Sequence, residues 1–202
     1  FVFTFLHIVV WTQSPLKNAL QTMRYEISAD GGTNACAVTY NPETDLYYTT
    51  FAGNASYPLE IFDSRGNTIH SSEIGIDLRG LWYNKKNNSL EGLAHPNKGK
   101  FSIPLNSNGL PLTLVKPKKD APAITNNQSV ACPSGKNLLL FDGKKISVIH
   151  GKSLRTKSTI SLVSMPVELS SLNYTTVVYT DVKNYEFAFY DAVESKVYFT
   201  NL

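Results

Sequence analysis

The sequence predicts an all-β fold made of four-stranded units, and two observations lead to that prediction. Short apolar segments alternate with turns rich in Pro, Gly, Asn and Asp, which is typical of strands joined by tight connections. The same order of strands and turns also recurs about every 43 residues. No window shows a convincing helical period with caps, apart from a short helical turn expected around residues 15–23.

The composition sets limits on the class of protein. The chain has 202 residues, of which 42% are hydrophobic and 17% charged, so it is too apolar for a disordered chain and too polar for a multi-span membrane protein. The net charge of +3 is too small to indicate a nucleic-acid partner. Only two cysteines occur, Cys36 and Cys132, which excludes a disulfide-rich scaffold and leaves their pairing open.

The first residues have a different character from the rest. Residues 1–11 (FVFTFLHIVVW) are almost uninterruptedly apolar, yet they are too few to span a bilayer, which requires about 20. They match the hydrophobic region of a secretory signal, although no basic segment precedes them. We therefore expect residues 1–21 to be signal-like and the protein to be secreted or periplasmic. A buried strand is the alternative.

The repeat is clearest in its first two copies. Tyr40-Asn41 lies over Tyr83-Asn84 at an offset of 43 residues, and Asp63-Ser64-Arg65-Gly66 lies over Asn106-Ser107-Asn108-Gly109 at the same offset. Two separate turns thus agree on one register without a gap. The strands expected in the first copy are residues 35–41, 46–52, 58–63 and 67–74.

Two weaker copies follow. We place Leu138-Leu139-Leu140-Phe141 and Val177-Val178-Tyr179-Thr180 at the position of Leu46-Tyr47-Tyr48-Thr49. The turn that begins at Asp63, which we call the marker turn, then recurs at residues 106, 150 and 191. The expected units span residues 35–74, 79–116, 128–162 and 167–202 within a domain of residues 22–202.

Four strands per unit of 40–45 residues are typical of the blades of a β-propeller. The segment PLEIFDSRGN (58–67) resembles the apolar strand, Asp, Gly and outer strand of the broad NHL, YVTN and WD-type propeller superfamily, without matching a specific family. The resemblance covers residues 36–202 and implies a propeller of about four visible repeats that we expect to be part of a larger ring. A four-bladed ring closed by residues 24–28, and a β-sandwich, are the alternatives.

Loops on a rigid frame are where binding residues concentrate. Consecutive hairpin connections alternate between the two faces of a propeller, and the longer ones share a face with the connections between blades. We call this the loop face and the opposite one, which carries the marker turns, the turn face. The candidate binding residues on the loop face are Tyr57, Asp77, Arg79, His95, Lys98, Asp181, Lys183 and Tyr185.

Residues that recur at the marker turns are interpreted differently. Asp63, Asn106 and Asp191 each begin such a turn, where a short side chain hydrogen-bonds backbone amides two residues on. That role is structural.

No nucleophile elbow, metal-binding histidine pair or phosphate loop occurs, so no catalytic residue, metal ligand or cofactor is predicted. The sequence favours a monomeric binding module that recognises a protein or glycan through the loop face, without a stable membrane span. The alternative is a metal-dependent propeller hydrolase or lactonase with its site at the channel mouth, and the question of an enzyme stays open.

Overall fold

The computed structural model of the chain describes most of the first three repeats and parts of the fourth. The described residues are 33–53, 58–95, 99–113, 115–118, 129–131, 136–141, 145–161, 177–179, 182, 187–191 and 196–200. The expected signal-like segment of residues 1–21 and the expected strand of residues 24–28 lie outside them. Within the described residues, no helix has the length and apolar character needed to cross a membrane.

The strands form four antiparallel sheets in chain order, which we call blades 1 to 4. Blade 1 contains β1 (Thr33–Asn41), β2 (Leu46–Gly53), β3 (Pro58–Asp63) and β4 (Thr68–Glu73). Blade 2 contains β5 (Asp77–Asn84), β6 (Ser89–His95), β7 (Gly99–Pro104) and β8 (Val115–Lys118), with the short 3-10 helix η1 (Lys85–Asn87) between β5 and β6. Blade 3 contains β9 (Ser129–Ala131), β10 (Asn137–Phe141), β11 (Lys145–His150) and β12 (Thr156–Ser161). Blade 4 contains β13 (Val177–Tyr179), β14 (Phe187–Asp191) and β15 (Lys196–Thr200).

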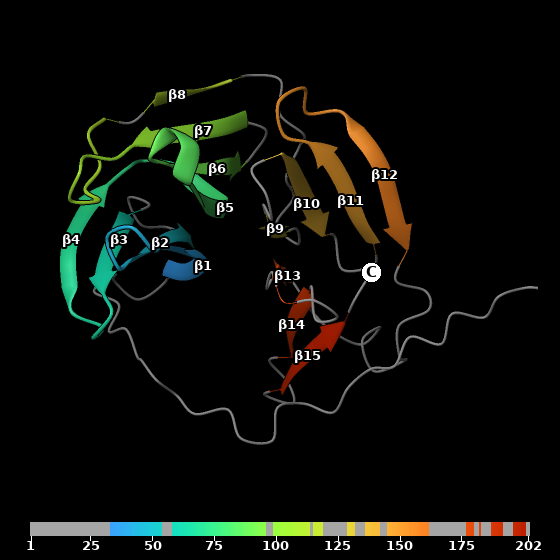
Figure 1. The fold of residues 1–202 in the computed structure, drawn as a ribbon, viewed down its shortest axis with the longest axis horizontal. Helices are drawn as coiled ribbons and strands as arrows, with labels where there is room; N and C mark the ends of the chain where they lie inside the picture. Colours follow the sequence, from blue (N-terminus) through green and yellow to red (C-terminus); the bar gives the residue numbers. More distant parts are fainter. Residues whose placement is uncertain are drawn as a thin grey trace, which may run out of the picture.

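The four sheets are arranged around a common centre (Figure 1). β1, β5 and β9 lie nearest that centre, and β4, β8, β12 and β15 lie at the rim. Within each blade, consecutive strands are neighbours in the sheet. The predicted fold class, a β-propeller of four-stranded blades, is confirmed. Blade 4 shows three strands within the described residues.

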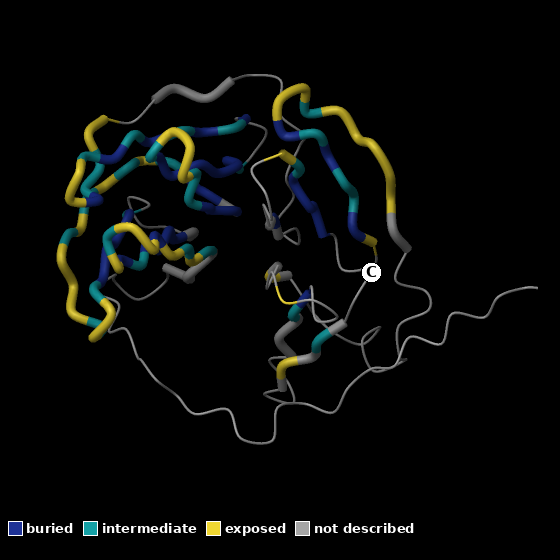
Figure 2. Tube along the Cα trace, in the orientation of Figure 1, coloured by how far each residue is buried: buried dark blue, intermediate teal, exposed yellow. Residues whose placement is uncertain are grey.

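Blades 1 and 2 pack face to face. Leu46, Tyr48, Leu59 and Ile61 of blade 1 form one buried cluster with the side chains that blade 2 turns toward them. These blade 2 residues are Leu78, Leu81, Leu90, Ala94, Phe101, Ile103 and Leu105. Figure 2 shows the result, with the middle strands of blades 1 to 3 mostly buried and the described outer residues of β4 and β12 mostly exposed. Each fully buried Leu or Phe contributes about 1.5–3 kcal/mol, so this interface is a main source of stability.

Hydrogen bonds reinforce the same interface. The buried Tyr48 hydroxyl donates to the Gly109 carbonyl in the marker turn of blade 2 at 2.9 Å. The Thr50 hydroxyl donates to the Leu78 carbonyl at 3.3 Å, at the start of β5. The following blade is therefore tied to the preceding one both at its marker turn and at its innermost strand.

Blades 2 and 3 repeat this arrangement, with one correction to the sequence alignment. Trp82 and Leu93 of blade 2 form a buried cluster with Leu138 and Leu140 of blade 3. These two leucines therefore face the preceding blade, whereas Leu46 and Tyr48 face the following one. The placement of residues 138–141 over residues 46–49 is wrong by one residue, since a slip of one residue turns every side chain to the other face.

The marker turns are built as the sequence predicts in blades 1 and 2. The Asp63 carboxylate accepts hydrogen bonds from the backbone amides of Arg65 and Asn67, both at 2.9 Å. The Asn106 side chain accepts from the amides of Asn108 and Leu110 at 2.9 and 3.0 Å. The structural interpretation is confirmed for these two residues, while the side chain of Asp191 lies outside the described part of the chain.

At the third marker turn an imidazole replaces the carboxylate or amide. His150 Nδ1 accepts from the Ser153 amide at 3.1 Å. The turn is one residue longer than in blade 1, because His150 pairs with Arg155 where Asp63 pairs with Asn67.

The close approach of blades 2 and 3 leads to a test. A Cβ atom added to Gly80 of β5 would lie 2.6 Å from Cβ of Val130 in β9. We expect Gly80→Val to lower the free energy of unfolding by about 1–3 kcal/mol through overpacking, measured by urea denaturation. Adding Val130→Gly removes that Cβ and makes room, so the double variant should recover part of the loss. Strictly additive costs of the two substitutions would contradict this packing.

Candidate functional site

Two of the predicted loop-face residues come together at one end of blade 2. Asp77 begins β5 and His95 ends β6, and the two residues are directly opposite each other in the antiparallel pair. Directly opposed residues have Cβ atoms about 5 Å apart and project from the same face of the sheet. Residues 18 positions apart in the sequence thus present a carboxylate and an imidazole side by side.

Local structure explains this placement. Gly75 has φ of +63°, the left-handed conformation that lets the chain turn from β4 into β5. The start of β5 is then held by the hydrogen bond from the Thr50 hydroxyl to the Leu78 carbonyl. Asp77 is 7% exposed, and His95 is half-buried. A largely buried carboxylate beside a more accessible imidazole is suited to hydrogen-bonding the polar groups of a ligand.

The other predicted loop-face residues remain expectations. Arg79 lies in β5 at a bulge between Leu78 and Gly80, and its side chain is outside the described part of the structure. Five further residues fall in segments that the structure does not describe, namely Tyr57, Lys98, Asp181, Lys183 and Tyr185. Cys36 is in β1, and Cys132 is outside the described residues.

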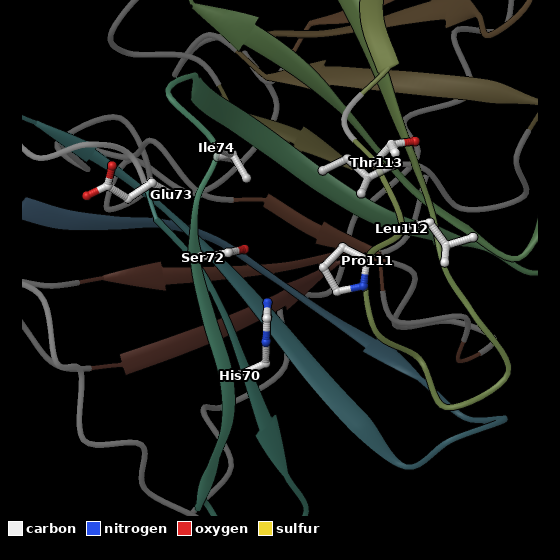
Figure 3. Close-up of a pocket in the computed structure, with 8 residues that line it drawn as sticks. His70, Ser72, Glu73, Ile74, Pro111, Leu112 and Thr113 are labelled. Atoms are coloured by element: carbon white, nitrogen blue, oxygen red, sulfur yellow. The ribbon is translucent and has the colours of Figure 1, made fainter.

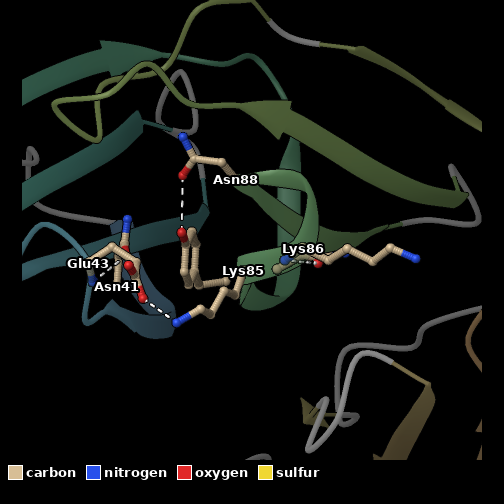
Figure 4. A network of polar contacts seen from close by, with 7 residues as sticks. Asn41, Glu43, Lys85, Lys86 and Asn88 are labelled. Carbon is tan, nitrogen blue, oxygen red and sulfur yellow. Dashed lines mark hydrogen bonds and ion pairs between the residues drawn. The ribbon is translucent and has the colours of Figure 1, made fainter.

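The turn face carries a polar network that joins blades 1 and 2 (Figure 4). Lys85 Nζ lies 2.6 Å from Glu43 Oε1, and the hydrogen bond and charge of Glu43 raise the pKa of Lys85. The Tyr83 hydroxyl donates to Asn88 Oδ1 at 3.1 Å, and burial together with the charge of Glu43 raises the pKa of Tyr83. Exposed ion pairs contribute little to stability, so we interpret this network as support for neighbouring turns.

Blade 2 also contains a buried carboxylate that sequence reasoning did not single out. Glu91 in β6 is 5% exposed, and its two oxygens accept three hydrogen bonds or ion pairs. Asn84 donates to Oε1 at 2.9 Å, while Trp82 Nε1 and Lys100 Nζ lie 3.0 and 2.7 Å from Oε2. Lys100 Nζ also lies 5.8 Å from the centroid of the Trp82 ring. The arrangement neutralises the carboxylate inside the sheet.

A repeated spacing was the signal that could have revealed Glu91. Asn41 donates to the Tyr48 hydroxyl at 3.5 Å, and Asn84 donates to Glu91 across the same seven-residue separation. Glu91 therefore occupies in blade 2 the position of Tyr48 in blade 1. Burial raises the pKa of Glu91, but the hydrogen bond and charge of Lys100, with the bonds from Asn84 and Trp82, outweigh burial and lower it.

Nowhere among the described residues do three or more His, Cys, Asp or Glu side chains gather closely enough to hold a metal ion. The Asp77 and His95 pair supplies two such groups.

The sequence matches no protein-family model and no curated protein. Solved structures give the comparison instead. Glutaminyl cyclase from Myxococcus xanthus superposes with a TM-score of 0.51 at 9% identity, over 77% of this chain and 60% of the enzyme. The β-propeller domain of Cps50 (Swd1) from Myceliophteria thermophila gives a TM-score of 0.48 at 12% identity, over 85% of this chain and 55% of that one.

A protein of unknown function from Bacteroides caccae gives a TM-score of 0.46 at 13% identity, over 87% of this chain and 70% of that one. The chain thus spans about half to two thirds of the length of these proteins. At such identities the likeness shows the fold alone, which is that of β-propeller proteins without a specific family.

The Glu91 cluster leads to a prediction with a defined pH dependence. Because the pKa of Glu91 is lowered by folding, its contribution to stability is complete above its unfolded pKa of about 4.3 and is lost as the pH falls through the folded value. We expect Glu91→Gln to lower the free energy of unfolding by about 1–3 kcal/mol near neutral pH. The difference from wild type should shrink below about pH 4.

Urea denaturation at several pH values measures this difference. Glu43→Gln is the matched control, because Glu43 makes its ion pair in solvent and its loss should change stability by less than about 1 kcal/mol at any pH. A Glu91→Gln cost that does not vary with pH would contradict the assignment.

Proposed function

We propose that the protein is an extracytoplasmic β-propeller that binds a protein or glycan through its loop face. The observation that carries the proposal is the opposition of Asp77 and His95 at the ends of β5 and β6. A carboxylate and an imidazole on one surface accept and donate hydrogen bonds, as the hydroxyls of a glycan or the amides of a peptide require.

The rigid frame supports the same proposal. Asp77 directly precedes Leu78, which is 1% exposed and belongs to the cluster between blades 1 and 2. His95 directly follows Ala94 of the same cluster. Both side chains are therefore anchored by buried neighbours, which lowers the entropy lost when a ligand is bound.

A glycan microarray and a library of phage-displayed peptides, probed with the full chain, test this function. We expect binding of a defined glycan or peptide class that Asp77→Asn and His95→Gln each weaken about tenfold, which corresponds to one lost hydrogen bond of about 1.4 kcal/mol. Lys85→Gln on the turn face is the control and should bind as wild type, because Lys85 is exposed on the opposite face.

Two results would overturn the proposal. One is that no glycan or peptide binds, and the other is that the loop-face variants bind as strongly as Lys85→Gln. Thermal melts with Ca²⁺ or Zn²⁺ and a chelator are run in parallel. A stabilising shift that the chelator reverses would instead favour the metal-dependent hydrolase.

A further inference from the structure

The rim of the propeller presents strand edges that differ in their protection. β4, β8, β12 and β15 are each the last strand of their sheet within the described residues, so one edge of each lacks a neighbouring strand. Natural proteins guard such edges with Lys or Pro. β8 (VKPK) contains both, and β12 (TKSTIS) and β15 (KVYFT) each contain Lys. β4 (TIHSSE) contains neither, and its one charged residue is Glu73 at its last position, so we call β4 the unguarded edge among the four.

A groove runs beside this unguarded strand (Figure 3). His70 and Ser72 of β4, with Ile74 just beyond it, form one wall, and residues 111–113 of blade 2 form the other. The second wall is held extended, because the Leu112 amide donates to the Pro104 carbonyl at 2.9 Å and Pro111 bridges to Leu105. The Asn106 marker turn thus places this segment opposite β4.

The groove has a volume of about 250 Å³. This is below the 300–1,000 Å³ of pockets for drug-sized molecules, so it suits one or two amino-acid side chains. Its apolar lining continues the interface between blades 1 and 2, since Ile74 and Ile103 belong to both. Leu112 on its wall is 60% exposed, and Ile69 of β4 is 49% exposed. Large apolar side chains so exposed favour contact with a partner.

The lining of the groove carries a negative charge. Glu73, at the end of β4, is exposed and lines the groove. It is the only Asp, Glu, Lys or Arg among the described lining residues. A partner that reaches this end is therefore favoured by a Lys or Arg.

We propose that β4 and its groove bind an extended peptide segment of another protein. The segment adds to blade 1 as a further strand beside β4, which pairs the backbone groups of the unguarded edge. One of its apolar side chains enters the groove between Ser72 and Pro111, and a basic side chain lies near Glu73. An extended backbone is the occupant that satisfies a strand edge, whereas a helix or a glycan offers no ladder of amides and carbonyls.

This surface lies at the rim and does not involve Asp77 or His95. The proposal goes beyond the loop-face function and is independent of it, so a negative result for one surface leaves the proposal for the other unchanged.

The test selects phage-displayed random peptides on the full chain and measures the affinity of the enriched ones as synthetic peptides. We expect alternating apolar and polar residues with a Lys or Arg at one end. Ser72→Lys, which fills the groove, and Leu112→Glu should each weaken binding at least tenfold. Glu73→Lys should lower the affinity for those peptides that carry the basic residue. Ser158→Lys on the exposed β12 strand is the matched control and should bind as wild type.

Several outcomes would overturn the proposal. Enrichment of no peptide, or peptides whose affinity Ser72→Lys and Leu112→Glu leave unchanged, would exclude this surface. A peptide whose affinity is lowered by Asp77→Asn but not by Leu112→Glu would be assigned to the loop face. A wild-type dimer that Leu112→Glu converts to a monomer would assign the edge to a second copy of the chain. Because Leu112 is exposed, the Leu112→Glu variant should have the melting temperature of the wild type. A loss of peptide binding in this variant can therefore be distinguished from a loss of folding.

Discussion

The packing of one sheet face against the next is the constraint on which the rest of the structure depends. A blade has apolar side chains on both faces, so it is buried only when it lies between two others. Blade 2 shows this directly, since Leu81 faces blade 1 and its neighbour Trp82 faces blade 3. Successive residues of a strand alternate between its two faces, so a blade that is covered on both sides requires apolar residues at consecutive positions. A register slip of one residue would turn each of these side chains toward the wrong neighbouring blade.

Much of the fold follows from turns that can be recognised in the sequence. Asp63 and Asn106 were found because a tight turn needs a short polar side chain at its first position, and both make the expected bonds to backbone amides. The third marker turn was placed correctly at His150, but residues 138–141 were misaligned by one residue. A run such as Leu138-Leu139-Leu140 does not reveal which face of the sheet each leucine takes.

The candidate sites illustrate the limits of sequence reasoning in the same physical terms. Asp77 and His95 were identified separately as loop-face residues, but their opposition depends on the β5–β6 register and its bulge. Glu91 was missed because its partners come from two other strands, β5 and β7, and only strand pairing brings Asn84 and Lys100 to the same carboxylate. The groove beside β4 depends on a hydrogen bond between Leu112 and Pro104 that no local pattern indicates.

The bond between Tyr48 and Gly109 has a consequence for the order in which the chain is completed. The two residues are 61 positions apart, and the donor is in the second strand of blade 1 while the acceptor is in the last turn of blade 2. A ribosome has therefore to deliver almost all of blade 2 before blade 1 can satisfy the polar group at the centre of its own apolar face. Blade 1 is thus finished by its successor, and during synthesis from the N-terminus it remains incomplete until the last turn of blade 2 has emerged.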